Sequence, residues 1–335
     1  MDLDKTFIIA ELSANHNHNF DLAVRTIESM AASGADAVKI QTYTADSLAL
    51  DVDNDYFGKI PDGLWKGISR YDLYKRGSMP YEWQPKLKQI AENLGLVFFS
   101  TPFDFEGVDF LEEMDIPMYK IASFEINDIP LIRYIAQKRK PIIFSTGVAG
   151  IDDIQLVVDT CYEQGNRDLS MLKCTSSYPA LPEDANLQTI PDMKAKFGLS
   201  VGVSDHTMGD LVPITAVALG AQIVEKHFIL SRALGGPDSS FSMEPEEFKL
   251  MVDNIRNVER ILGHVKYEVS DKDKLRRRSL YASADIKAGD VFTEKNVRSF
   301  RPGFGLQPRF YDMILGTNSK RDITKGNPLL ETDLC

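Results

Sequence analysis

The sequence predicts an α/β fold: a closed (β/α)8 TIM barrel followed by a small, mostly β domain. Short apolar runs alternate with helix-length segments between residues 7 and 230, and this alternation is typical of a parallel sheet. Every run stops at polar residues, as barrel strands do at the rim that carries the chemistry. The chain has 335 residues, whereas one barrel typically takes about 250, so the remainder predicts a second domain.

Eight apolar runs are the predicted barrel strands. In chain order they are 7–12, 37–43, 97–103, 118–123, 141–147, 169–176, 199–207 and 223–230. The segments between them carry apolar residues three and four positions apart, as at Val157 and Cys161, which is typical of amphipathic helices. No glycine-rich phosphate loop follows the first run, so a closed barrel is favoured over an open doubly wound sheet.

The organisation of the chain changes near His264. A long amphipathic helix is predicted at 246–263, and a charged stretch follows at 270–278. From 279 to 335, short apolar pieces are separated by Lys-Ala-Gly-Asp and Lys-Gly-Asn turns, which predicts a compact β module. We therefore expect a barrel domain at 1–263, a linker at 264–278 and a second domain at 279–335.

Composition and charge exclude several classes of protein. The formal net charge is −11, which argues against a nucleic-acid partner because phosphate backbones are bound by surplus lysine and arginine. The chain has no stretch of about eighteen apolar residues, and residues 1–9 lack the basic start of a signal peptide, so we expect a cytoplasmic protein without a membrane partner. The three cysteines have no paired spacing, which excludes a disulfide framework and a zinc knuckle.

Two histidines end the seventh and eighth predicted strands. His206 and His227 lie on neighbouring strands, which are about 4.8 Å apart, so both imidazoles can bind one divalent ion. Two histidine ligands with open positions suit Mn²⁺, Fe²⁺ or Zn²⁺. Glu225 lies two residues before His227 and therefore faces the same side of its strand. The alternative is that each histidine is an ordinary hydrogen-bonded residue.

Cations and hydroxyls collect at the same predicted rim. Such donors bind a phosphate or a carboxylate, with lysine as a point charge and hydroxyls that fix orientation. Lys39 and Lys120 stand inside apolar strands, where a lysine is costly to bury unless it is paired. We expect them to bind an anion, and a structural ion pair with Glu11 or Glu225 is the alternative. The uncharged donors of this rim are Gln41, Ser100, Thr101, Ser123, Ser145 and Thr146.

An ordered set of motifs carries a resemblance to a known family. The chain resembles the sialic acid synthase family of nonulosonic acid synthases in the segments IIAELSANHN, ADAVKIQTY, FFSTPFD, YKIASFE, FSTGVA, KCTSSYP, VGVSDHT, VEKHFILSR and GGPDSSFSMEP, and in RRSLYASADIKAGDVFTEKNVRSFRPGFGL. The stretches 64–87 and 299–311 are most similar to the pseudaminic acid synthase branch. Two positions depart from the family's pattern: His18 replaces a common glycine, and Ser176 stands where neuraminate synthases carry asparagine.

The resemblance implies a reaction and a cofactor. Members of the family condense phosphoenolpyruvate with an open-chain amino sugar and water, and phosphate leaves by cleavage of a C–O bond. For the pseudaminic acid branch the sugar is 2,4-diacetamido-2,4,6-trideoxy-L-altrose, and the product is pseudaminic acid. A divalent metal at His206 and His227 assists, with Mn²⁺ as the expected ion and Mg²⁺ or Co²⁺ as alternatives.

The resemblance also assigns roles to residues of this chain. Phosphoenolpyruvate is expected to contact Lys39, Thr101, Lys120, Ser123 and Ser145, with Tyr178 and Ser204 nearby. Glu11 and Asp238 are expected to position the sugar, while Glu225 acts near the reacting carbons. The C-terminal domain resembles the family's antifreeze-like (SAF) domain, which caps the partner's barrel in a domain-swapped homodimer. Arg301 matches the arginine that this domain delivers to the sugar's amide.

Several alternatives stay open at this point. The nearest is the same reaction on N-acetylmannosamine or on the legionaminic acid precursor. A Schiff-base aldolase with Lys120 or Lys173 as nucleophile is another, and a noncatalytic carbohydrate-binding protein is a third. The attacking water is activated by Glu225, by Glu11 or by the metal. Four aromatic residues either contact the sugar's methyl and acetamido groups or pack between helices. They are Tyr71, Tyr74, Tyr81 and Trp83.

Overall fold

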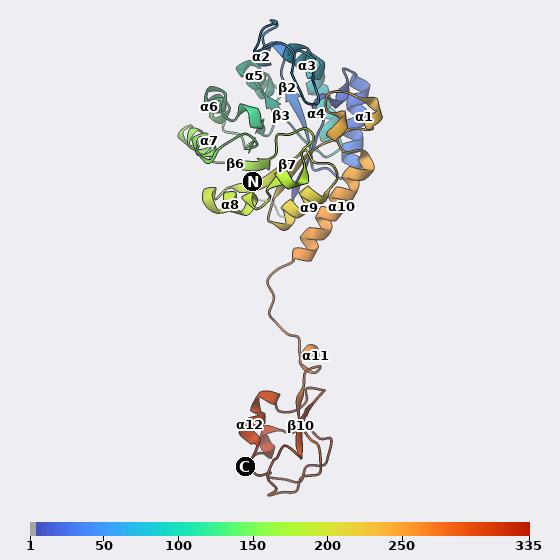
Figure 1. Cartoon of the computed structure of the whole chain (residues 1–335), viewed down its shortest axis with the longest axis vertical. Helices are drawn as coiled ribbons and strands as arrows, with labels where there is room; N and C mark the ends of the chain where they lie inside the picture. The colour runs from blue at the N-terminus through green and yellow to red at the C-terminus, as the bar shows by residue number, and fades with distance from the viewer. Residues whose placement is uncertain (1–4) are drawn as a thin grey trace. The chain divides into compact units, whose positions relative to one another are not determined.

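The computed structural model describes residues 5–335, which form two compact units divided between Gly263 and His264 (Figure 1). The first unit is built on a closed barrel whose strands follow one another in chain order. Helices surround this barrel. The first unit is therefore the predicted (β/α)8 TIM barrel.

The barrel strands coincide with the eight predicted runs. They are β1 (Phe7–Glu11), β2 (Ala37–Thr42), β3 (Val97–Pro102), β4 (Tyr119–Ile121), β5 (Ile142–Ser145), β6 (Leu169–Cys174), β7 (Ser200–Asp205) and β8 (Ile223–His227). Each strand ends one to three residues before its run does, because the residues that follow turn into loops. β8 pairs with β1 in parallel, which places Glu11 opposite His227, and Glu11 also stands opposite Lys39 of β2. The register therefore brings three strands to one level of the rim.

Helices and short 3-10 turns connect these strands. The helices are α1 (Phe20–Ala32), α2 (Ala45–Leu48), α3 (Arg70–Gly77), α4 (Gln84–Asn93), α5 (Phe105–Glu113), α6 (Ile129–Gln137), α7 (Ile151–Glu163), α8 (Thr189–Phe197), α9 (Leu211–Ala218) and α10 (Pro245–Leu262). The turns are η1 (Ser13–His16), η2 (Tyr81–Trp83), η3 (Ser123–Glu125), η4 (Pro182–Ala185), η5 (Arg232–Leu234) and η6 (Ser239–Phe241). Asn19, Asp104 and Asp128 cap α1, α5 and α6 by accepting backbone hydrogen bonds. Within residues 5–335, no helix combines the length and apolar composition that crossing a membrane requires.

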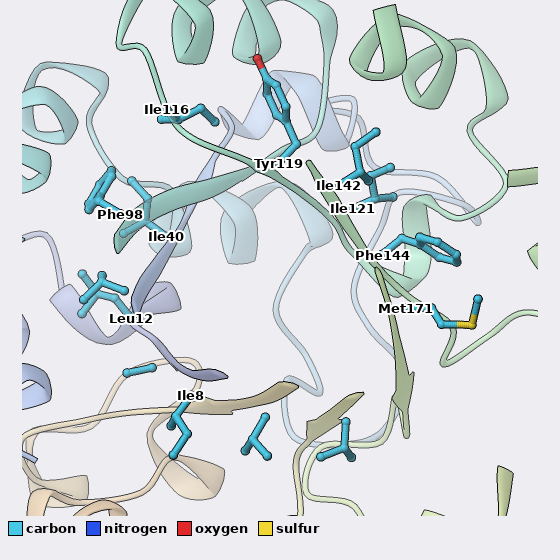
Figure 2. Packing of buried hydrophobic residues seen from close by; sticks show 14 of the residues in the cluster. Ile8, Leu12, Ile40, Phe98, Ile116, Tyr119, Ile121, Ile142, Phe144 and Met171 are labelled. Carbon is cyan, nitrogen blue, oxygen red and sulfur yellow. The ribbon is translucent and has the colours of Figure 1, made fainter. Parts of the chain in front are cut away.

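Alternation of side chains along each strand produces two apolar layers and a polar rim. Ile8, Ile40, Phe98 and Phe144 belong to the main core between strands and helices (Figure 2). Residues of the opposite parity form the barrel interior: Ile9, Ala37, Phe99, Met118, Ile143, Leu172 and Ile223. The next inward position on each of these strands is Glu11, Lys39, Thr101, Lys120, Ser145, Cys174 or Glu225. The apolar interior therefore directly supports the polar site above it.

Gly202 of β7 leaves its interior position without a side chain. A Cβ there would lie 2.3 Å from the Ile223 carbonyl oxygen and 2.7 Å from Leu172 Cδ2. We expect Gly202→Ala to lower the free energy of unfolding by about 1–3 kcal/mol, the usual cost of overpacking, as measured by urea denaturation. Gly150→Ala is the matched control, since its Cβ would meet Asp153 Oδ2 at an ordinary 3.5 Å. Equal losses in the two variants would contradict the packing argument.

The second unit contains an antiparallel strand pair, β9 (Ser279–Ala282) and β10 (Val297–Phe300). It also contains α11 (Asp271–Lys274), η7 (Pro308–Phe310), α12 (Tyr311–Ile314) and η8 (Glu331–Asp333). Its own small core includes Leu280, Phe292 and Ile323. This agrees with the predicted small β domain.

Candidate active site

Four buried charged side chains face one another at the carboxyl ends of the strands. Lys39 pairs with Glu11, and its Nζ lies 3.9 Å from Glu225 Oε2. Lys120 Nζ lies 3.7 Å from Glu225 Oε1, so Glu225 stands between two ammonium groups. All four residues are at most 6% exposed. The ion pairs that the sequence left open as an alternative are present, and they hold both ammonium groups at the rim.

Burial and charge set the protonation of the two carboxyls in opposite directions. Burial raises the pKa of Glu11 to about 7, although the charge of Lys39 opposes this shift. Burial acts in the same direction on Glu225, but the charges of Lys120 and Lys39 outweigh it and hold the pKa of Glu225 below its usual range. Glu225 is therefore the more acidic member of the pair.

Two hydroxyls accompany the two ammonium groups. Lys120 Nζ donates to Ser145 Oγ at 2.6 Å, and Lys39 Nζ donates to Thr101 Oγ1 at 3.4 Å. Positive charge with neighbouring hydroxyls is the donor set that binds phosphate and carboxylate groups. These four predicted anion ligands thus form one site.

Further hydroxyls are fixed beside this set. Gly147 N donates to Ser123 Oγ at 3.0 Å. A Cβ at Gly147 would lie 2.8 Å from that oxygen and 2.1 Å from Ser176 Oγ, so only glycine fits this approach. Ser204 Oγ donates to Glu225 Oε1 at 2.9 Å and thereby orients the carboxylate.

The two histidines lie side by side, with ring centroids 5.3 Å apart. His206 Nδ1 lies 2.9 Å from the Thr175 carbonyl oxygen. A carbonyl oxygen only accepts, so Nδ1 carries a proton. Burial alone would lower the pKa of His206, but its contacts with Cys174 and Thr175 raise it above the usual value. Among residues 5–335, His227 Nδ1 is one of the buried polar atoms without a hydrogen-bond partner, and it lies 4.0 Å from Asp238 Oδ2.

This pair of imidazoles can hold a divalent cation. Burial lowers the pKa of His227 well below its usual value, which keeps its ring neutral as a metal ligand requires. Within the described part of the chain, no group of three histidine, cysteine, aspartate or glutamate side chains is arranged to hold a metal. A cation here would therefore take further ligands from water or substrate.

Aromatic rings surround the two imidazoles. The ring centroid of Tyr178 lies 4.5 Å from that of His206, and the ring centroid of Phe241 lies 5.0 Å from that of His227. Trp65 lies 5.6 Å from Tyr178 and donates its indole N–H to the Pro237 carbonyl oxygen at 2.9 Å. These rings exclude water from one side of the site and offer an apolar face to a bound molecule.

The loop after β1 ties two carboxyls together. Ser13 N donates to Glu11 Oε1 at 3.1 Å, and Ser13 Oγ donates to Asp238 Oδ2 at 2.5 Å. Ala14 N donates to the same Asp238 oxygen at 3.3 Å. Glu11 and Asp238 therefore take fixed positions on the β1 and β8 sides of the site.

Comparison with known proteins places the chain in a family. The NeuB family model matches residues 26–267, and the SAF domain model matches residues 277–334. The chain belongs to the NeuB family. This confirms the family resemblance seen in the motifs, and the SAF match confirms the antifreeze-like domain.

Individual relatives of this NeuB-family chain have related activities. A pseudaminic acid synthase from Campylobacter jejuni is 47% identical over 332 residues, which cover 98% of this chain and 96% of the relative. An N,N'-diacetyllegionaminic acid synthase from Legionella pneumophila is 36% identical, and the match covers 97% of this chain and 93% of the relative. The crystal structure of an N-acetylneuraminic acid synthetase from Leptospira borgpetersenii in complex with citrate matches with a TM-score of 0.72. The sequences are 32% identical, and the match covers 81% of this chain and 90% of that one.

The structure of this NeuB-family member separates the predicted site residues into two groups. Arg301 is exposed and belongs to the second unit. The others lie at the carboxyl ends of the barrel strands or in the loops that follow: Glu11, Lys39, Thr101, Lys120, Ser123, Ser145, Tyr178, Ser204, His206, Glu225, His227 and Asp238.

Lys173 does not fit the Schiff-base alternative. It lies between Leu172 and Cys174, which both face the barrel interior, so Lys173 faces the other side of β6. Its Nζ donates to Thr175 Oγ1 at 2.9 Å. Lys173 is therefore not placed to act as the nucleophile of the Schiff-base alternative.

The four aromatic residues considered as a sugar wall pack elsewhere. Tyr71, Tyr74, Tyr81 and Trp83 contact Asp46, Tyr43, Phe110 and Phe20, respectively. Trp65 and Phe241 lie at the site in their place, and sequence reasoning missed both. The signals were present, since Trp65 falls in the distinctive 64–87 stretch and Phe241 falls within the GGPDSSFSMEP motif.

Sequence reasoning also missed Glu125, which follows the predicted ligand Ser123 in η3. Glu125 Oε2 is among the buried polar atoms without a hydrogen-bond partner in residues 5–335. Burial raises the pKa of Glu125 to about 7, with Lys120 acting in the opposite direction and Asp128 in the same one. The YKIASFE motif contains this residue, but nothing in its spacing separates a buried glutamate from an exposed one.

Glu125 makes stability fall as pH rises. Between its ordinary pKa of 4.5 and the folded value of about 7, the folded chain keeps a proton that the unfolded chain releases. We expect Glu125→Gln to gain up to about 3 kcal/mol in unfolding free energy relative to wild type between pH 4 and pH 8, measured by urea denaturation. Exposed Glu82→Gln is the control. A difference between Glu125→Gln and wild type that stays constant over this range would contradict the assignment.

Proposed function

We propose that the chain is a pseudaminic acid synthase, which condenses phosphoenolpyruvate with 2,4-diacetamido-2,4,6-trideoxy-L-altrose and water to give pseudaminic acid and phosphate. The observation that carries the proposal is the 47% identity to a pseudaminic acid synthase over 98% of this chain, against 36% to a legionaminic acid synthase. The site geometry supports the same chemistry.

The lysines and hydroxyls supply the phosphoenolpyruvate site. This substrate carries a phosphate and a carboxylate, and the buried pair Lys39 and Lys120 offers two ammonium groups on either side of Glu225. Thr101 and Ser145, which accept from these lysines, orient the anion together with Ser123. Tyr178 and Ser204 complete the surroundings of the site.

The reaction places opposite charges at two points. The enol carbon of phosphoenolpyruvate attacks the aldehyde carbon of the sugar, so negative charge develops on the aldehyde oxygen and C2 becomes cation-like. Water then adds at C2, and one of its protons converts the alkoxide into a hydroxyl. Phosphate departs as its C–O bond breaks, while the hydroxyl left on C2 becomes the ketone carbonyl and its proton leaves with phosphate. Glu225, held between two ammonium groups, is our assignment for stabilising C2. Glu11 and Asp238, joined through Ser13, position the sugar.

We also propose that His206 and His227 bind Mn²⁺, with Mg²⁺ or Co²⁺ as alternatives. A divalent cation acts as a Lewis acid toward developing negative charge, which here is that on the aldehyde oxygen. His206 supports this role through its Nδ1 hydrogen bond to Thr175, which leaves Nε2 as the nitrogen that can bind a metal when the ring is neutral. His227 supports it through a buried nitrogen that has no hydrogen-bond partner within residues 5–335.

Phosphate release measures this function directly. We expect release that requires both phosphoenolpyruvate and the diacetamido sugar, stops on treatment with a chelator and returns with Mn²⁺. N-acetylmannosamine and the legionaminic acid precursor are the comparison sugars. A preference for either one would overturn the proposed sugar, and release that is unaffected by a chelator would overturn the metal.

We propose a domain-swapped homodimer in which the SAF domain closes the partner's barrel and Arg301 contacts the sugar's amide. The support is the SAF match at 277–334, which includes an exposed Arg301. Mixing His227→Ala with Arg301→Ala chains is expected to restore partial activity, because a swapped pair contains one intact site. Absence of complementation would contradict the swap.

A further inference from the structure

A cavity of about 480 Å³ lies next to the aromatic side of the site. Three segments line it: the loop after β1, the stretch that includes α3 and the loop after β8. Its lining includes Asn17, Trp65, Ile68, Leu73, Ser239 and Ser240. This volume falls in the usual range for small-molecule sites.

The two loops of the cavity are locked together by close packing. Asn17 has a left-handed backbone with φ of 46° and donates from Nδ2 to the Gly235 carbonyl oxygen at 3.1 Å. A Cβ at Gly236 would lie 2.4 Å from Asn17 Oδ1, and Gly236 has φ of 118°. Only glycine allows this approach, so the cavity is preformed by the backbone.

Trp65 joins the cavity to the reacting centre. It lines the cavity and also packs on Tyr178, which in turn packs on His206. Asp238 lies between the lining residues Pro237 and Ser239, and its Oδ2 is 4.0 Å from His227 Nδ1. A sugar held by Asp238 therefore has one part of its carbon chain beside the cavity.

The lining combines the two properties that an N-acyl group needs. Leu73, Ile68 and the Trp65 ring offer apolar surface to a methyl group. The Asn17 side-chain oxygen and the Ser239 and Ser240 hydroxyls line the same cavity and can hydrogen-bond to an amide. A simple hydroxyl would leave this apolar surface in contact with water.

We propose that this cavity receives the second N-acyl group of a diamino hexose and selects such sugars over hexoses with one acetamido group. The inference rests on the proposed function and deepens it, because it assigns the choice of sugar to residues outside the phosphoenolpyruvate site. Ser13, Asp238 and Glu11 hold the sugar near the imidazoles. Trp65 and Leu73 then contact its second N-acyl group in the cavity.

Filling the cavity tests the proposal. Leu73→Trp is expected to lower kcat/KM for the 2,4-diacetamido sugar about tenfold or more, mainly through KM, and to leave that for N-acetylmannosamine unchanged. Tyr71→Trp is the matched control on the same helix, since Tyr71 contacts Asp46 and is not part of the lining. An equal fall in kcat/KM for both sugars, or an unchanged KM for the diacetamido sugar, would overturn the proposal.

A second measurement does not depend on activity. The chain has two tryptophans, so Trp83→Phe leaves Trp65 as the only emitter. We expect a saturable change in its fluorescence with the diacetamido sugar and a smaller one with N-acetylmannosamine. Identical responses to the two sugars would overturn the cavity assignment even where Leu73→Trp does not fold.

The wild-type preference separates this inference from the proposed function. A wild type that prefers another 2,4-diacetamido hexose contradicts the proposed sugar alone, and the Leu73→Trp comparison is then made with that hexose. A wild type that prefers N-acetylmannosamine contradicts both proposals.

Discussion

His227→Ala is expected to lower the rate of phosphate release by about 10²- to 10³-fold, and His206→Ala is expected to act similarly. Each substitution removes one of the two imidazoles whose centroids lie 5.3 Å apart, and a cation held by one ring has lost half of its protein ligands. Steady-state phosphate assays at saturating Mn²⁺ measure the effect.

Metal binding provides a readout beside activity. Mn²⁺ is expected to raise the melting temperature of wild type, because a ligand that binds only the folded state stabilises it. His227→Ala is expected to lose this shift. His264→Ala, which removes an exposed histidine outside the barrel unit, is the control and is expected to retain it. A His227→Ala chain with the wild-type rate and the wild-type Mn²⁺ shift would remove the metal assignment.

Strand register explains why so much of the site was predictable. Ile9 and Glu11, or Ile223 and Glu225, are two positions apart, so an inward-facing apolar residue in the sequence is followed by an inward-facing polar one. The eight runs therefore predict both the barrel and the ring of polar side chains at its rim. The predicted strands overshoot by one to three residues, partly because apolar loop residues such as Phe103 and Phe228 continue the runs.

Loop packing explains what the sequence did not predict. Trp65 and Trp83 come from one aromatic stretch, yet one packs on Tyr178 at the site and the other on Phe20. No periodicity distinguishes them, because their positions depend on contacts with segments far away in the chain. Glu125 is similar, since nothing in the sequence around η3 predicts that one of its carboxylate oxygens is buried.

Lys120→Met is expected to reduce both stability and activity. Lys120 is 1% exposed, and its Nζ lies 3.7 Å from Glu225 Oε1. Without it, Glu225 keeps only the more distant charge of Lys39, which is already paired with Glu11. A buried carboxylate that loses its partner typically costs about 3–5 kcal/mol, so the unfolding free energy should fall by this amount. Phosphate release should fall at least about 10²-fold, because the anion site loses one of its two charges.

The double variant Lys120→Met/Glu225→Gln separates charge balance from chemistry. The amide of glutamine needs no compensating cation, so most of the stability lost in Lys120→Met is expected to return, while phosphate release stays low. Urea denaturation and phosphate assays on both single variants and the double variant complete the cycle. Lys173→Met is the control, because this half-buried lysine faces away from the barrel interior. If the two stability losses simply add, the ion pairs do not balance the buried charge of Glu225. If activity recovers with stability, neither the charge of Lys120 nor that of Glu225 is needed for the reaction.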